Sequence, residues 1–382
     1  MARWWKREEK AVVPISALSV PVGSGAGGQG YGSLARRGFM GNPVACRCVR
    51  MVAEAVACVP LVHYRGGVEV SGSPEQALLA RPNPGMAGPE FMETLVGHLL
   101  LSGNAYVEPV LLNGERCALY AIRPDRVTAQ IGRDGWTEAY AIETARGTRR
   151  VAVAGEAGDL LHLKLFHPLN DHTGLSPLAS AAAALDLGNA AASWNKALLD
   201  NSARPSGALV YQPKEGGNLS PTQFERLKRE LEEGYSGSLN AGRPLLLEGG
   251  LDWKAMGLTP RDMDFTEARN GAARDIALAL GVPPMLLGIP GDNTYANYQE
   301  ANRAFIRLTV LPLMTRVLSG FAHWFDPDGR AELRIEPDLD RIPGLSNERD
   351  QLWARIGAAA FLTDAEKREA VGYSPDGGPH VD

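Results

Sequence analysis

Several signatures of common protein classes are absent from this chain of 382 residues. No run approaches the roughly 18 uninterrupted apolar residues of a membrane-spanning helix, so we expect no membrane association. The N-terminal stretch imitates a secretory signal, but acidic residues and Pro14 interrupt its apolar pattern, so we expect a cytosolic product. The cysteines lack the close paired spacing of a zinc site and are predicted to be free thiols: Cys46, Cys48, Cys58 and Cys117.

Familiar enzyme motifs are missing as well. The patterns GxxxxGK[ST], HExxH and GxSxG do not occur, which removes the usual sequence support for nucleotide hydrolysis, zinc proteolysis and hydrolase chemistry. A match to GxGxxG at residues 23–28 has no clear strand before it or helix after it. His162, His167 and His172 recur every five residues, but only His162 is expected to lie in a strand. We therefore predict no enzyme and nominate no catalytic, cofactor-binding or metal-binding residue.

Positive charge is not in excess. The 39 Lys and Arg residues face 44 Asp and Glu residues, a net charge of -5. A protein that grips nucleic acid over its whole surface neutralises many phosphates with Lys and Arg. Any contact with DNA is therefore predicted to be local or sliding.

The chain does contain ordinary material for two or three packing units, with 45% hydrophobic residues. After a Gly- and Ser-rich arm, periodicity predicts a helical base followed by an antiparallel meander, whose hairpin turn is marked by Asn113 and Gly114. Ser73 and Gln76 predict a helix start. Helices are predicted over 43–57, 75–79 and 89–101, and strands over 59–65, 105–112, 116–122, 127–131, 136–142, 149–153 and 159–166.

An alanine-rich segment follows, with Ser176 as the predicted N-cap and Pro177 in the first turn. One helix is predicted to run to about Ala203, a length of roughly 40 Å. Small side chains allow close approach, so we expect this helix to pack against several others, including those of neighbouring subunits. A compact β-α-β unit comes next, with a strand at GALVY, a helix over 221–233, a strand at PLLLE and a short strand near Trp253.

The stretch from Ala277 to Phe305 raises the main question, because a helix over 264–280 stops there and restarts after a loop rich in Pro and Gly. No Lys or Arg lies between Gly281 and Glu300. The second helix, over 297–325, contains Pro312, which removes a hydrogen bond and predicts a kink. Two short helices, starting at Ser346 and at Thr363 with Glu366, are predicted last.

Six segments in this order and spacing resemble the portal proteins of tailed double-stranded-DNA phages, in the lambdoid siphophage branch. They are LLARPNPGMAGPEFMETLVGHLLLSGNAYVEPVLLNGE, LYAIRPDRVTA, LLHLKLFHPLNDHTGLSPLASA, ARPSGALVY, IALALGVPPMLLG and TYANYQEANRAFIRLTVLPLMTRV. The resemblance covers about residues 40–375, and related gene transfer agents carry the same kind of protein. It implies an α+β fold with a β-rich wing, a long helical stem, a small α/β clip and a short helical crown.

The resemblance also implies domain boundaries. These are a flexible arm at 1–38, the wing at 39–175, a stem helix at 176–205, the clip at 206–260, a second stem helix at 261–281, the tunnel loop at 282–297, a kinked wing helix and strand at 298–345, and a short crown and tail at 346–382. This crown is reduced, so its interior contacts are less defined by the resemblance.

The implied function is that of a head-tail connector: a ring, usually dodecameric, at one capsid vertex for DNA packaging and ejection. The implied partners are other copies of the chain, the major capsid protein, the large terminase subunit, a head-tail adaptor protein and double-stranded DNA that passes without sequence recognition. No cofactor and no membrane are implied. The expected location is the portal vertex of a virion or phage-like particle, assembled in the host cytoplasm.

Two groups of residues become candidate sites. The resemblance places these residues in the DNA-channel tunnel loop: Pro290, Gly291, Asp292, Asn293, Thr294, Tyr295 and Asn297. A loop without Lys or Arg is expected to touch DNA by shape and weak hydrogen bonds, because phosphate ion pairs would hold the duplex. Glu225, Arg226 and Arg229 are candidates for the clip docking surface. The alternatives are an ordinary helix-loop-helix connection and a solvated helix face.

A second class of function remains open on the sequence alone. The chain also fits a cytosolic α+β enzyme without a recognisable catalytic motif. Assembly state separates the two, since a portal protein forms a ring with a central channel and such an enzyme forms a compact monomer or dimer.

Overall fold

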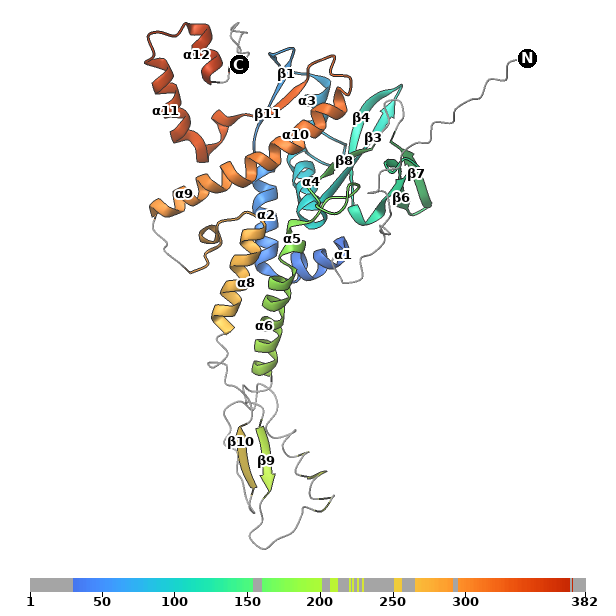
Figure 1. Ribbon diagram of the computed structural model, residues 1–382, viewed down its shortest axis with the longest axis vertical. Helices are drawn as coiled ribbons and strands as arrows, with labels where there is room; N and C mark the ends of the chain where they lie inside the picture. Colours follow the sequence, from blue (N-terminus) through green and yellow to red (C-terminus); the bar gives the residue numbers. More distant parts are fainter. Residues whose placement is uncertain are drawn as a thin grey trace, which may run out of the picture. The chain divides into compact units, whose positions relative to one another are not determined.

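The computed structural model describes residues 30–153, 160–200, 207–211, 251–255, 265–290, 295–371 and 373, together with Ser220, Thr222, Glu225, Arg226 and Arg229. These residues fall into two compact units (Figure 1). Unit 1 comprises Met1–Ala182 and Ile276–Asp382, and unit 2 comprises Ala183–Asp275. The glycine-rich match at 23–28 lies outside the described residues.

Unit 1 begins with a helical layer: α1 (Tyr31–Leu34), a π-helical turn η2 (Ala35–Met40), α2 (Pro43–Ala57), α3 (Pro74–Ala80) and α4 (Gly88–Ser102). The side chain of Asn42 caps α2 by accepting from the N–H groups of Val44 and Ala45. Helices α2 and α4 pack together through fully buried aliphatic residues such as Val52 and Leu95. The helices predicted over 43–57, 75–79 and 89–101 are confirmed to within a few residues.

A small antiparallel sheet joins distant parts of the chain in unit 1. Strand β1 (Leu61–Arg65) pairs with β2 (Val68–Val70) on one edge and with β11 (Arg334–Pro337) on the other. Ser73 caps α3 as predicted, with its hydroxyl accepting from Gln76 N–H, but the Gln76 side chain accepts from Gly72 rather than from Ser73. The sheet therefore links the first and last thirds of the sequence.

The predicted single meander is wrong, because its strands form two separate three-stranded sheets. One sheet has the order β4-β3-β8, with β3 (Asn104–Leu112), β4 (Glu115–Ile122) and β8 (Leu161–Lys164). The other contains β5 (Val127–Ile131), β6 (Thr137–Thr144) and β7 (Gly147–Ala152) in that order. A 3₁₀ turn η3 (Pro124–Arg126) interrupts the chain after β4, and the buried first half of β3 takes β8 as its second neighbour. The hairpin at Asn113 and Gly114 is confirmed, with φ of 54° and 86°.

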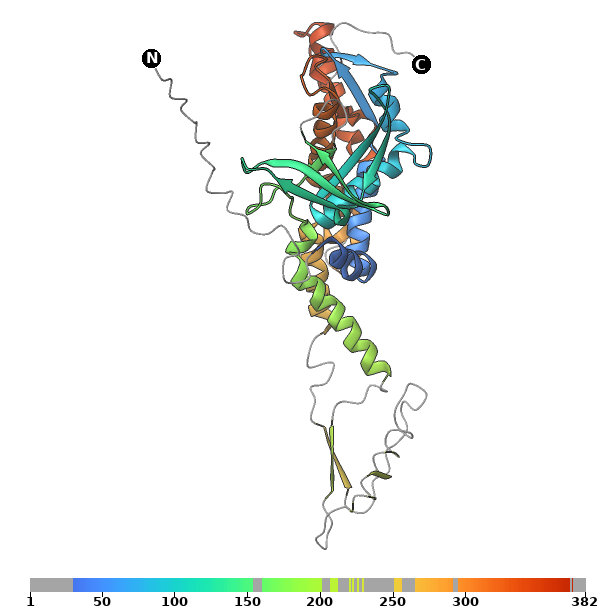
Figure 2. The same ribbon diagram turned by 90° about the vertical axis from the view of Figure 1, so that its right-hand side faces the viewer.

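The two sheets pack against each other (Figure 2), and Tyr106 of the first sheet contacts Tyr140 of the second in a buried cluster between them. His162 of β8 stacks on Tyr106 with ring centroids 4.4 Å apart, and its ring nitrogens lie 3.1 Å from the Tyr140 hydroxyl and 2.9 Å from Asn104 Oδ1. Burial lowers the pKa of His162 to about 3. The prediction that only His162 lies in a strand is confirmed, because His167 and His172 occupy the following loop. These histidines serve packing and loop structure.

The alanine-rich helix is broken near its start, contrary to the prediction of one continuous helix. Helix α5 (Pro177–Ser180) ends at Ala181, and α6 (Ala182–Asp200) begins directly after it. Ser176 caps α5 as predicted and also donates its hydroxyl to the Leu100 carbonyl. The Ser180 hydroxyl donates to the Pro177 carbonyl, which an α-helix would offer to Ala181 N–H instead. The break coincides with the boundary between the units.

Unit 2 contains α6, the strands β9 (Gly207–Tyr211) and β10 (Leu251–Ala255), and most of α8 (Phe265–Ala279). The predicted strands at GALVY and near Trp253 are confirmed. They pair directly as an antiparallel ribbon with Leu209 opposite Trp253, so the described strands do not form a parallel β-α-β arrangement. The segment PLLLE and most of the predicted helix over 221–233 lie outside the described residues.

A long helical rod crosses unit 1, built from α9 (Tyr295–Phe305), a π-helical turn η6 (Ile306–Val310) and α10 (Leu311–Phe325). Within the described part of the chain, Asn297–Phe325 is the one helix long and apolar enough to span a membrane by length and composition. Its apolar face is used inside unit 1, where Val310, Met314, Val317 and Phe321 are fully buried. It is therefore the central core helix of this unit.

The chain then forms two short 3₁₀ turns, η7 (Leu339–Arg341) and η8 (Pro343–Leu345), and the helices α11 (Ser346–Gly357) and α12 (Asp364–Val371). The capping box at the start of α12 is confirmed. Glu366 accepts from the N–H and the hydroxyl of Thr363, and the Thr363 hydroxyl accepts from Glu366 N–H.

Two half-buried histidines, His98 and His162, predict that unit 1 loses stability in mild acid. Burial lowers the pKa of His98 to about 4 and of His162 to about 3, against about 6.5 in an unfolded chain. The unfolded state therefore binds protons first as the pH falls below about 6.5. At pH 5 each of these histidines lowers the free energy of unfolding by about 2 kcal/mol. Urea unfolding at pH 7.5 and pH 5 measures this loss. We expect His162→Gln to reduce the difference and His323→Gln, at an exposed position, to leave it unchanged. A His162→Gln variant with the full pH dependence would contradict the prediction.

Candidate functional site

The candidate site is the last turn of α8 together with the segment that links it to the long rod, and we call the described part, Ile276–Pro290, the connector. All of it belongs to unit 1, and it contains no charged residue. It includes the 3₁₀ turn η5 (Pro284–Leu287), which packs against α9 and α2. The connector is therefore an apolar segment supported by two helices of the same unit.

Gly281 ends α8 in a hydrogen-bonded left-handed turn. Its φ is +67°, its N–H donates to the Leu278 carbonyl at 3.1 Å, and Val282 N–H donates to the Ala277 carbonyl at 2.8 Å. This is the Schellman pattern, in which a residue with φ above zero satisfies the last carbonyls of a helix. Val282 is 2% exposed, so an apolar contact fixes the chain directly after the turn.

The same arrangement occurs again seven residues later. Gly288 has φ of +70°, its N–H donates to Met285, and Ile289 N–H donates to the Pro284 carbonyl at 3.4 Å. Ile289 is 8% exposed. Each of the two triplets, GVP and GIP, consists of a left-handed glycine, a buried β-branched residue and a proline. Two consecutive left-handed turns, at Gly281 and at Gly288, thus anchor the connector up to Pro290.

The long rod forms a hydrogen bond to the first of these turns, the one at Gly281. The Thr309 hydroxyl, in the π-helical turn η6, donates to the Gly281 carbonyl at 2.6 Å. The approach is so close that a Cβ atom at position 281 would lie 2.6 Å from Thr309 Oγ1. The π turn directly precedes Pro312, and Leu311 N–H bonds to the Ile306 carbonyl, five residues back. A π-helical turn therefore precedes Pro312, while the kink predicted from this proline stays a prediction.

The predicted tunnel-loop residues are only partly described. Pro290 is exposed at the end of the connector, Tyr295 is the first residue of α9, and Asn297 is exposed on the same helix. Gly291, Asp292, Asn293 and Thr294 lie outside the described residues.

Sequence reasoning missed the residues that anchor the connector. Gly281, Val282, Gly288, Ile289 and Thr309 did not enter the predicted site. The repeated GVP and GIP triplets are a signal that was available for the first four. Thr309 lies 28 residues from Gly281 and has no such signal.

The predicted docking residues lie in the other unit. Glu225, Arg226 and Arg229 are helical and exposed, as expected for the polar face of a surface helix. They belong to unit 2, whereas the connector belongs to unit 1.

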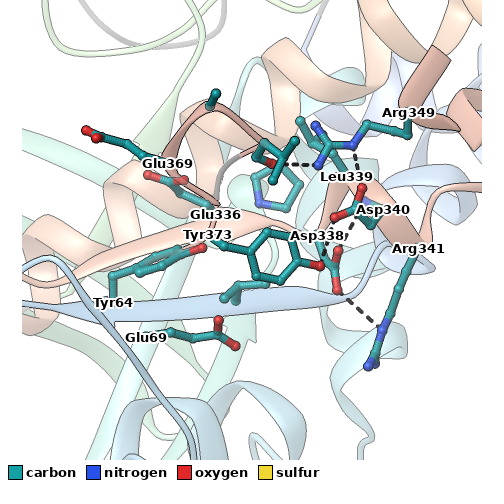
Figure 3. A pocket seen from close by; sticks show the side chains of 14 residues that line it. Tyr64, Glu69, Glu336, Asp338, Leu339, Asp340, Arg341, Arg349, Glu369 and Tyr373 are labelled. Carbon is teal, nitrogen blue, oxygen red and sulfur yellow. Dashed lines mark hydrogen bonds and ion pairs between the residues drawn. The ribbon is translucent and has the colours of Figure 1, made fainter. Parts of the chain in front are cut away.

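The described part of unit 1 also has a polar cavity of about 390 Å³ beside its last helices (Figure 3). At its wall, Asp340 accepts from the Arg349 guanidinium and from the Tyr373 hydroxyl, the latter at 3.0 Å, and Arg349 also donates to the Val371 carbonyl. The hydrogen bond from Arg349 lowers the pKa of Asp340. Since most described residues of α11 and α12 are exposed or half-buried, this polar cluster is a main attachment of the helix pair.

Comparison with known proteins gives a consistent result. A family model described as "Phage portal protein" matches residues 43–372. A protein of Rickettsia bellii is 42% identical over 87% of this chain and 86% of its own length. The portal protein of Enterobacteria phage HK97 is 24% identical over 97% of this chain and 89% of its own length.

Solved structures of particle necks are similar in fold and sequence. A chain in the neck of an empty gene transfer agent particle, computed with C6 symmetry, is 52% identical and has a TM-score of 0.72. The chain in the neck of the native particle, computed with C12 symmetry, is 52% identical with a TM-score of 0.69. Both matches cover 90% of this chain and 94% of the other.

The two left-handed glycines give a matched pair of substitutions. Gly288→Ala introduces only backbone strain, because its φ is +70° and nothing lies within 4 Å of the added Cβ, so we expect a loss of about 1–2 kcal/mol. Gly281→Ala adds the same strain and a 2.6 Å contact with Thr309 Oγ1, so we expect a further loss of about 1–3 kcal/mol. Denaturant unfolding measures both. Equal losses would show that Thr309 does not constrain position 281.

Proposed function

The chain belongs to the phage portal protein family, and on that premise we propose that its copies form the ring-shaped DNA channel at the neck of a phage-like particle. As a portal protein it has a structural role at the portal vertex. The observation that carries the proposal is the 52% identity with a chain in the C12-symmetric neck of a native gene transfer agent particle. By analogy with that symmetry, the ring is dodecameric.

The two units divide the work of the ring. Unit 2 supplies the clip at 206–260 and most of the stem helices at 176–205 and 261–281, whose outer ends, 176–182 and 276–281, belong to unit 1. Unit 1 supplies the wing at 39–175 and 298–345, the tunnel loop at 282–297, and a short crown from 346. The antiparallel ribbon of β9 and β10 belongs to the clip.

The tunnel loop faces the duplex, and its composition suits a passing polymer. Each Lys or Arg that neutralises a phosphate releases counterions and adds affinity that must be lost again when DNA advances. No Lys or Arg is present from Gly281 to Glu300, so the channel constriction offers shape and weak hydrogen bonds in place of ion pairs. DNA then passes without sequence recognition and with little adhesion.

The anchoring of the connector meets the second requirement of a constriction, which is a fixed base. The left-handed turns at Gly281 and Gly288 bury Val282 and Ile289, and the described connector rests on α2 and α9. A loop carried on such a base keeps its distance from the channel axis while DNA is under load.

The clip docks the large terminase subunit during packaging and a head-tail adaptor protein afterwards, with Glu225, Arg226 and Arg229 on the docking surface. The major capsid protein surrounds the ring, which assembles in the host cytoplasm. ATP hydrolysis belongs to the terminase, because the chain has no P-loop pattern. The alternative of a cytosolic enzyme draws no support from the family or from the matched folds.

Assembly state tests the proposal. We expect the purified chain, or particles that carry it, to show rings with a central channel by negative-stain microscopy, because closed cyclic contacts satisfy identical subunits. A chain that stays a compact monomer or dimer, and is absent from the particle neck, would refute the proposed function.

Charge substitution tests the passage of DNA. Asn293→Lys combined with Thr294→Lys adds cations to the tunnel loop, so we expect packaging to slow severalfold at 50 mM salt and to recover partly at 200 mM, where phosphate contacts weaken. A reconstituted packaging assay with nuclease-protected DNA gives the rate. Thr128→Lys with Thr148→Lys, at exposed positions of β5 and β7, is the control with the same charge change. Unchanged packaging by the loop variant would count against the low-adhesion channel.

A further inference from the structure

The spacing of buried residues in the long rod shows what the π-helical turn does. Phe305 directly precedes the turn and Val310 is its last residue; both are buried and they lie five residues apart. In an α-helix five residues advance the direction of a side chain by about 500°, which is some 140° beyond a full turn. The extra residue of η6 therefore brings both side chains onto the core face.

The same turn sets which side chain meets the connector. Leu308, one position before Thr309, is 77% exposed. Thr309 is the residue that reaches the Gly281 carbonyl. A helix shifted by one residue would present Leu308 to this carbonyl. Leu308 has no hydroxyl to donate, so the hydrogen bond would be lost.

The hydrogen bond made by Thr309 is unusual for a threonine within a helix. Such a hydroxyl commonly bonds back to a carbonyl of the preceding turn. A hydroxyl has one proton, and here it goes to Gly281, 28 residues earlier in the chain. Thr309 thereby joins the rod to the end of α8.

Gly281 is adapted to receive this bond. The Schellman turn uses the carbonyls of Leu278 and Ala277 and turns the chain at Gly281. The absence of a Cβ lets Thr309 approach, since an added Cβ would lie 2.6 Å from Oγ1 and 3.1 Å from Cγ2. Both partners are therefore shaped for this one contact.

We propose that Thr309 is a positioning residue of the channel: its hydroxyl, held in register by the π turn, fixes the base of the DNA-facing loop to the central rod. This role rests on the proposed function, while the contact itself does not. Loss of the hydroxyl leaves the ring intact but lets the connector move relative to α9 and α10, so DNA advances past a less precisely placed constriction.

Three variants distinguish the effect of the Thr309 hydroxyl from the effect of side-chain volume. Thr309→Val keeps the shape and removes the donor, Thr309→Ser keeps the donor, and Thr315→Val makes the same chemical change at an exposed position of α10. Hydrogen exchange of peptides covering residues 277–290 is measured in the assembled full-length protein, with packaging measured in particles.

We expect Thr309→Val to speed exchange in the connector by about 2- to 12-fold, the range set by one net hydrogen bond. Packaged DNA should fall, and both effects should be restored by Thr309→Ser and absent in Thr315→Val. Connector exchange unchanged by Thr309→Val would overturn the proposal, and so would faster exchange with normal packaging. If the wild-type chain forms no rings, the proposed function fails, whereas the exchange comparison still decides the contact on the unassembled chain.

Discussion

The left-handed turn at Gly281 is the constraint on which the connector depends. It ends α8, buries Val282 and presents a carbonyl that accepts a hydrogen bond from the Thr309 hydroxyl. Only a residue without a Cβ allows both the positive φ and the close approach of Thr309. One glycine thus connects the last residues of α8 with the core helix of unit 1.

The rest of the connector repeats this left-handed glycine turn and contains no charged residue. Gly288 and Ile289 form a second left-handed turn with the same hydrogen-bond pattern. Apolar burial and backbone hydrogen bonds therefore anchor the connector in place of ion pairs. This choice is consistent with a channel for DNA, because a cation close to the duplex would bind phosphate. Neutral anchoring residues fix the connector without adding a phosphate-binding charge.

Elsewhere the chain does use charge to attach elements. The cluster around Asp340 holds α11 and α12 through Arg349 and Tyr373, with little help from buried apolar side chains. A helix pair held mainly by polar contacts is expected to open locally more easily than the core around Phe321. The two attachments therefore differ in kind: the connector is held by apolar and neutral groups, and the terminal helices by polar and charged groups.

The sequence by itself determined the local elements of this protein, including α2, the hairpin at Asn113 and Gly114, the capping box of α12 and the stretch without Lys or Arg after Gly281, because each follows from neighbouring residues. Its ordered motifs also sufficed to predict the portal family. Tertiary structure alone decided that β8 pairs with β3, that the alanine-rich helix breaks at Ala181, and that Thr309 meets Gly281. These three features depend on contacts between residues distant in the chain or on competition for one carbonyl, and neither periodicity nor composition carries that information.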